Sequence, residues 1–88
     1  MVHAIKLLEQ YAQAVKDGEK TFEIRYNDRG YQKGDRIRFK VVDNRPYLHS
    51  DVSYIYDLPE YEVTYVHSGL GMADNYVALA IKPVEDAE

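Results

Sequence analysis

Residues 18–35 read GEKTFEIRYNDRGYQKGD, and the middle of this stretch decides the expected fold. Apolar side chains at positions 22, 24 and 26 alternate with polar ones at positions 21, 23 and 25. Because successive side chains of a strand point to opposite faces, this alternation predicts a strand with one apolar and one polar face. The polar face carries Glu23 beside Arg25, and Lys20 precedes the strand. Strands are usually poor in Lys and Glu, so this face is either a solvated surface or the floor of a polar site.

Short segments on both sides of this strand complete the expected fold. Alternating apolar residues predict strands over 36–42, 61–67 and 76–82, and strand-forming residues favour a further short strand over 52–56. Apolar residues within 3–17 have nearly helical spacing, and Gly18 is a natural helix end because glycine adopts a left-handed backbone at no steric cost. Closing the sheet would remove edges that so short a chain cannot cover. The sequence therefore predicts an α+β fold, a small β-barrel of five or six strands with one principal helix.

The apolar faces of the predicted strands supply the expected core. We expect the following side chains to be largely buried: Phe22, Ile24, Ile37, Phe39, Val41, Val63, Tyr65, Val77, Leu79 and Ile81. The chain also has nine tyrosines, and a tyrosine can stack on a nucleobase. The tyrosines left as candidates for the surface or a pocket are Tyr31, Tyr47, Tyr54, Tyr56 and Tyr76.

Length and composition predict one domain without disulfides. The chain has 88 residues, which suit one modest core over residues 1–83, and its acidic end, residues 84–88, is expected to fray. It has no cysteine, no signal-peptide pattern and no apolar run long enough to cross a bilayer, so we expect a cytoplasmic protein. The net charge of −4 argues against non-specific binding to duplex nucleic acid, although six Lys and Arg residues fall within positions 20–38. No cofactor is expected, and the histidines lack metal-ligand spacing.

The quoted stretch resembles the ASCH domains of the PUA-like superfamily. Their signature is a helix that ends in Gly, a short turn with Lys, and a strand that carries Glu and Arg. The matching residues here are Gly18, Lys20, Thr21, Glu23 and Arg25. Residues 3–6, 27–35 and 76–82 also resemble one small uncharacterised branch found in phages and bacteria. The resemblance implies a PUA-like mixed barrel with a short strand near 3–8 and a helix near 9–17, packed over one end of the barrel.

The resemblance also makes the polar strand face a candidate binding site. Its centre is Lys20, Glu23 and Arg25, and Arg29 and His3 are expected nearby. An arginine fork suits a carbonyl, carboxylate or phosphate, and a carboxylate can accept the amino group of a base. Spacing alone favours a solvated face with weak surface ion pairs, whereas the resemblance favours the site.

Three functions follow from these residues and from the resemblance. The leading one is binding of single-stranded or modified RNA, or of a nucleotide-sized ligand, in a cleft between the helix end and the barrel. The superfamily also contains an amidohydrolase of acetylated cytidine, whose site resembles this sequence at Lys20 and Arg25, but Glu23 stands where that enzyme has a nucleophilic Thr. A carboxylate cannot replace this hydroxyl, because its attack on an amide would give an unstable anhydride. A small hydrolase of a modified base and a protein-interaction module remain alternatives, so it stays open whether the chain is an enzyme.

Overall fold

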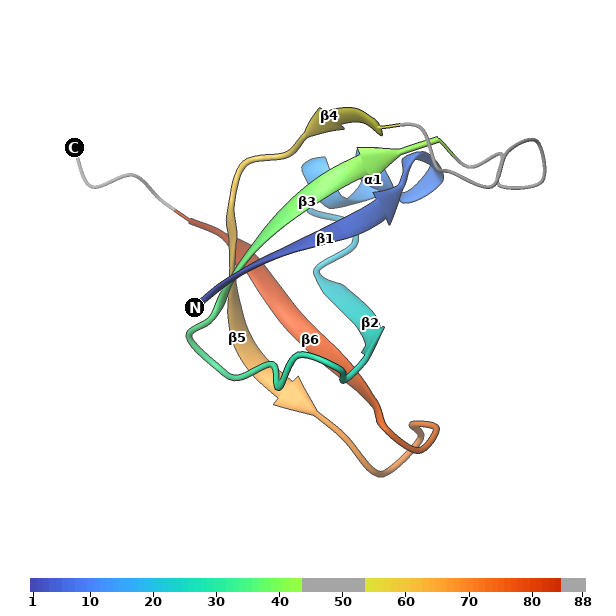
Figure 1. The fold of residues 1–88 in the computed structure, drawn as a ribbon, viewed down its shortest axis with the longest axis vertical. Helices are drawn as coiled ribbons and strands as arrows, with labels where there is room; N and C mark the ends of the chain where they lie inside the picture. The colour runs from blue at the N-terminus through green and yellow to red at the C-terminus, as the bar shows by residue number, and fades with distance from the viewer. Residues whose placement is uncertain (44–53, 85–88) are drawn as a thin grey trace.

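The computed structural model describes residues 1–43 and 54–84, which form a curled half-barrel sheet with one helix (Figure 1). The elements in chain order are β1 (Val2–Leu8), α1 (Glu9–Lys16), β2 (Phe22–Tyr26), β3 (Arg36–Val42), β4 (Tyr54–Asp57), β5 (Tyr61–His67) and β6 (Tyr76–Pro83). The predicted α+β fold is confirmed, with six strands and one helix over the described residues. The early strand followed by a short helix is confirmed too, whereas the sheet curls without closing into a full barrel.

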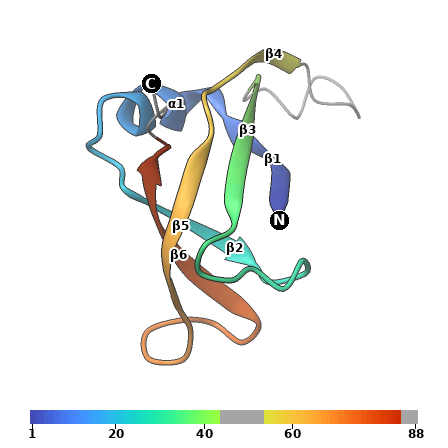
Figure 2. The ribbon, with the colours of Figure 1, turned by 90° about the vertical axis from the view of Figure 1, so that its left-hand side faces the viewer.

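The strands form one mixed sheet in the order β1-β3-β5-β6-β2. β1 runs parallel to β3, and the other pairings of the described strands are antiparallel. β3 pairs on its second side with β5 near its start and with β4 near its end. β1 and β2 are therefore the two edge strands of this order, and they face each other across the open side of the half-barrel (Figures 1 and 2).

The helix lies at one end of the half-barrel and ends close to the predicted glycine (Figure 2). It buries Ala12 and Val15 against β1 and β3. Gly18 has a φ of +78°, a left-handed conformation that glycine adopts without strain, and its N–H donates to the carbonyl of Val15. The N–H groups of the next two residues both donate to the carbonyl of Ala14. The chain is thereby turned back on the helix, which brings Lys20 to the start of β2.

The core lies inside the half-barrel. Seven of the ten side chains that we expected in it are buried: Ile37, Phe39, Val41, Val63, Val77, Leu79 and Ile81. The first strand and the helix add Ile5, Leu7, Ala12 and Val15. Tyr31, which the sequence left as a candidate for the surface or a pocket, is also buried there.

Phe22, Ile24 and Tyr65 contradict the core prediction, because they are 45%, 52% and 61% exposed. In β2 the alternation is correct but the faces are exchanged. Glu23 is only 6% exposed and faces the interior, whereas the apolar side of the strand faces outward. In β5 a bulge between Val63 and Tyr65 shifts the alternation by one residue and turns Tyr65 outward.

Two predicted segments fall largely outside the described residues. They are the connection over 43–51, with Tyr47 and His49, and most of the acidic tail over 84–88. The short strand expected over 52–56 is observed as β4, starting at Tyr54. Within residues 1–43 and 54–84, no helix has the length and apolar character that crossing a membrane requires.

Candidate functional site

Lys20, Glu23 and Arg25 meet on the inner side of β2. The carboxylate of Glu23 lies between the two cations, because Lys20 Nζ donates to its Oε1 at 2.6 Å and Arg25 Nη1 donates to its Oε2 at 3.3 Å. Lys20 Nζ also donates to the backbone carbonyl of Phe22 at 2.8 Å. Glu23 is buried, and the side chains of Lys20 and Arg25 are 19% and 29% exposed. The three residues proposed as the centre of the site therefore form one partly buried cluster.

A hollow of about 350 Å³ opens beside this cluster, between α1 and β2. Its lining residues are Tyr11, Lys20, Phe22, Glu23 and Ile24. Lys20 Nζ lies 4.9 Å from the centre of the Phe22 ring and 5.7 Å from that of Tyr11, distances at which an ammonium is attracted to an aromatic face. The hollow thus combines aromatic side chains with an ammonium–carboxylate pair, which suits a flat ring with polar edges.

Arg25 and Arg29 both reach across the open side of the half-barrel. Arg25 Nη1 donates to the carbonyl of Lys6 at 3.1 Å, and Arg29 Nη1 donates to the carbonyl of Ala4 at 2.9 Å. Both carbonyls belong to the edge strand β1. We call this junction, in which the two arginines bridge to β1, the seam. Arg29 is therefore placed at the seam and does not line the hollow.

His3 has partners other than the proposed site residues. Its Nε2 lies 2.8 Å from Oδ2 of Asp35, and its ring packs edge-on against Tyr31 with 4.7 Å between ring centres. Burial opposes ionisation of Asp35, but the hydrogen bonds from His3 and from the N–H of Gln32, together with the N-terminal charge, outweigh it and lower the pKa of Asp35. The contacts of His3 thus tie β1 to the segment before β3, and His3 does not line the hollow.

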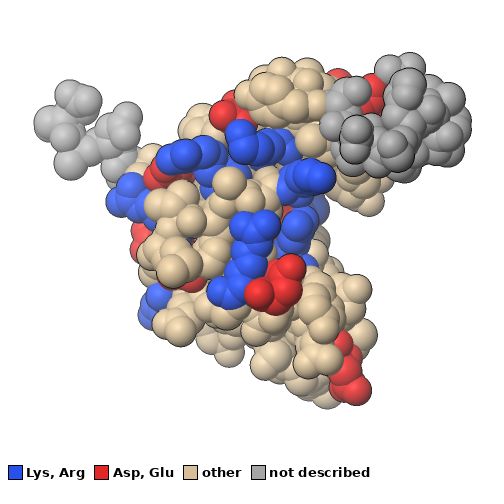
Figure 3. All heavy atoms as spheres, viewed as in Figure 1, with Lys and Arg blue, Asp and Glu red and all other residues tan. Residues whose placement is uncertain are grey.

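A second group of charges covers the outer side of β1 and β3, where Lys and Arg gather in Figure 3. Lys6 and Lys40 are paired in register, and Arg36 and Arg38 lie on the same side of β3. Arg36 and Arg38 contact the carboxylate of Glu60 at 3.4 and 2.8 Å. The hydrogen bond from Arg38, and then that from Arg36, lowers the pKa of Glu60. These outer cations are thus partly neutralised by acidic neighbours.

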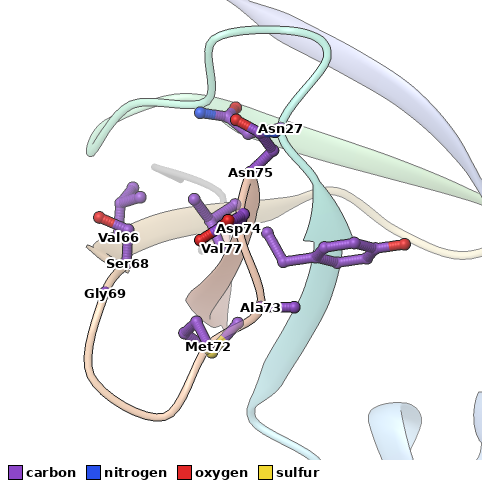
Figure 4. Close-up of a pocket in the computed structure, with 10 residues that line it drawn as sticks. Asn27, Val66, Ser68, Gly69, Met72, Ala73, Asp74, Asn75 and Val77 are labelled. Carbon is purple, nitrogen blue, oxygen red and sulfur yellow. The ribbon is translucent and has the colours of Figure 1, made fainter.

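A larger hollow, of about 410 Å³, lies between the β5–β6 connection and the end of β2 (Figure 4). Its polar lining comes from Asn27, Ser68, Asp74 and Asn75, and none of the described residues that line it is Lys or Arg. The side-chain oxygen of Asn27 accepts the N–H of Tyr31, which fixes one of these groups within the fold. With one carboxylate and no cation among these described residues, the hollow is poorly suited to an anionic ligand.

The sequence reasoning missed three lining residues: Phe22 and Ile24, which it placed in the core, and Tyr11, which it did not assign. Tyr11 lies on α1 and is 42% exposed, between glutamines at positions 10 and 13. An aromatic residue on the polar side of a short helix was the available signal. Its contact with Lys20 depends on the reversal of the chain after the helix, which spacing along the sequence does not reveal.

A comparison with known families adds to this geometry. The sequence profile of a family described as "Domain of unknown function (DUF3850)" matches residues 2–81. The chain belongs to this family. The match runs from β1 into β6, so the DUF3850 region includes the Lys20–Glu23–Arg25 cluster, the hollow and the seam. No curated protein matches the sequence. Membership of DUF3850 therefore identifies the domain without assigning it an activity.

Proposed function

We propose that this DUF3850 domain binds single-stranded or modified RNA and takes one unstacked base into the hollow between α1 and β2. The observation that carries the proposal is the Lys20–Glu23 pair, with 2.6 Å between Nζ and Oε1, beside two aromatic rings. Proteins recognise single-stranded RNA by stacking splayed bases on aromatic side chains and by hydrogen bonds to the edges of the bases. The hollow offers both kinds of group, and the resemblance to ASCH domains of the PUA-like superfamily supports the same class of ligand.

The cluster retains hydrogen-bonding capacity for a base. An ammonium has three N–H donors, and among the described residues Lys20 uses two of them, toward Phe22 and Glu23. A carboxylate has about four acceptor positions, so Glu23 can accept a further hydrogen bond beside Lys20. A donor next to an acceptor complements a ring nitrogen next to an exocyclic amino group, the pattern of cytosine and adenine. Uracil offers the same kind of pair, a carbonyl next to a ring N–H, so the cluster complements an edge of each of these bases.

Titrations with short labelled RNAs test this proposal. We expect cytidine, adenosine and uridine octamers to bind, because each of these bases offers an acceptor next to a donor. Lys20→Ala should weaken binding of the cytidine octamer about tenfold or more, because a hydrogen bond to a charged group contributes roughly 1.5–3 kcal/mol. Glu23→Gln should also weaken binding of the cytidine octamer, because the amide has one acceptor oxygen where the carboxylate has two.

Lys33→Ala is the charge-matched control, because Lys33 is exposed and does not line the hollow. Circular dichroism and thermal unfolding of each variant separate a loss of binding from a loss of fold. Equal affinities of the folded wild type and folded Lys20→Ala would refute the proposal, and so would a failure of all three octamers to bind.

A further inference from the structure

Aromatic and small apolar side chains cover the outer side of β2, β5 and β6, which are neighbours in the sheet (Figure 1). We call this surface the aromatic face, and its residues are Phe22, Ile24, Tyr26, Tyr65, Tyr76, Ala78 and Ala80. Among them, Phe22, Tyr26, Tyr65 and Tyr76 are 45%, 52%, 61% and 41% exposed. Single exposed apolar residues are ordinary, but a contiguous group across three strands marks an interaction surface.

The strand register makes the aromatic face a shallow trough. Ala80 of β6 lies opposite Phe22 on one side and opposite Tyr65 on the other. Ala78, the next residue on the same side of β6, lies opposite Ile24. Neighbouring strands are about 4.8 Å apart, so the larger side chains stand roughly 10 Å apart across an alanine floor. Walls of this kind give flat rings a surface on which to stack.

The strands of the aromatic face carry few outward charges, and Lys82 of β6 lies opposite Glu62 of β5 in the register. On the outer sides of β2 and β6, as the structure describes these strands, Lys82 is the charged residue and no carboxylate occurs. The ammonium of Lys20 lies over the ring of Phe22 at the margin of the face. A strand that follows β2 and β6 therefore passes mostly uncharged side chains, and each of the two cations has a carboxylate neighbour, Glu23 for Lys20 and Glu62 for Lys82.

The aromatic face is continuous with the hollow, because Phe22 and Ile24 belong to both. We propose that this face carries the nucleotides next to the base in the hollow, so that the ligand is an extended single strand of several nucleotides and not a free nucleoside. Phe22, Ile24 and Tyr26 follow one another along β2 at intervals of about 6.7 Å. The rings of Tyr26 and Tyr76, 5.5 Å apart and edge to face, form the far end of this path. This inference rests on the proposed function.

Stacking explains why such a face suits a nucleic acid strand. Every base has a π-face, so aromatic side chains on an open sheet hold successive bases with little dependence on sequence. A protein partner or a second copy seated on the same face would cover Phe22 and Ile24 and thereby obstruct the hollow. Continuity with the hollow therefore favours the strand of nucleotides as the occupant.

The test compares a nucleoside with an oligomer. Cytidine and the cytidine octamer are titrated against the wild type, Tyr65→Ala and the double variant Tyr26→Ala with Tyr76→Ala. We expect each variant to lose about fivefold or more in affinity for the octamer, as the loss of a base–aromatic stack predicts, while its affinity for cytidine is unchanged. Tyr54→Ala is the matched control, because Tyr54 is an equally exposed tyrosine on β4, outside the aromatic face, and should bind as the wild type does.

Two results separate this inference from the proposed function. If the tyrosine variants bind the octamer as tightly as the wild type while Lys20→Ala weakens binding, the inference is refuted and the proposed function stands. If neither ligand binds the wild type, both are refuted. Sedimentation of the free protein gives an independent check, because a dimer that Tyr65→Ala dissociates would assign the aromatic face to a second copy of the chain and overturn the inference.

Discussion

At the scale of single residues, Glu23 explains the unexpected orientation of β2. A buried carboxylate is costly unless it is paired and hydrogen-bonded. Glu23 meets this condition, because Lys20 donates to one of its oxygens and Arg25 to the other. The pairing allows the charged side of β2 to face the interior, and Phe22 and Ile24 are consequently turned toward solvent. The same carboxylate thus supplies the polar group of the hollow and turns Phe22 and Ile24 to the outer side of β2, where they line the hollow and the aromatic face.

Asp35 gives the stability of the fold a predictable pH dependence. The pKa of Asp35 is lowered in the folded state from its ordinary value of 3.8. Ionised Asp35 therefore stabilises the fold at pH values above 3.8, and this stabilisation is lost as the pH falls through the lowered pKa of the folded state. We expect Asp35→Asn to reduce the free energy of unfolding at neutral pH and to flatten its decline between about pH 5 and pH 2. Urea denaturation across this range, with exposed Asp28→Asn as the control, measures the effect. Parallel profiles for the wild type and Asp35→Asn would show that the contact of Asp35 with His3 contributes no stability.

At the scale of elements, the sequence predicted the positions of the strands and the helix because these depend on local patterns. Alternation marked the strands, and Gly18 marked the end of the helix. The inward face of β2 could not be predicted, because an alternating strand fits the sheet either way and the choice depends on the burial of Glu23. The bulge beside Tyr65 depends on pairing with β6, and the contact of Tyr11 with Lys20 depends on packing of α1. The central cluster was predictable because its three residues fall within six positions, 20–25.

The seam supports a prediction about the edges of the sheet. Arg25→Ala removes the hydrogen bond to the carbonyl of Lys6 and leaves Glu23 with one cation fewer. We expect the free energy of unfolding to fall by about 1–2 kcal/mol, because the buried carboxylate of Glu23 loses one cation and a backbone carbonyl of the edge strand β1 loses its hydrogen-bond donor. Arg36→Ala is the control, since its side chain is 51% exposed and pairs on the surface, where a loss of less than about 1 kcal/mol is expected. An equal or greater loss for Arg36→Ala in urea denaturation would contradict a stabilising role of the seam.

At the scale of the whole molecule, the net charge of −4 conceals a separation of surfaces. Cations gather over β1 and β3 (Figure 3), whereas the outer side of β2 and β6 is aromatic and nearly uncharged. The hollow lies at the edge of the aromatic side, between α1 and β2. This arrangement favours recognition of a single strand, which needs stacking surfaces and a few polar groups. Duplex binding would require a broad cationic contact surface.

The most direct test of base binding in the hollow is an NMR titration of isotope-labelled protein with the cytidine octamer. We predict saturable shifts that are largest at the amides of Tyr11 and residues 20–24, extend to Tyr26 and Tyr65, and become smaller in Lys20→Ala. Shifts confined to the cations of β1 and β3, such as Lys6 and Arg38, would contradict the account, as would a spectrum that the octamer leaves unchanged.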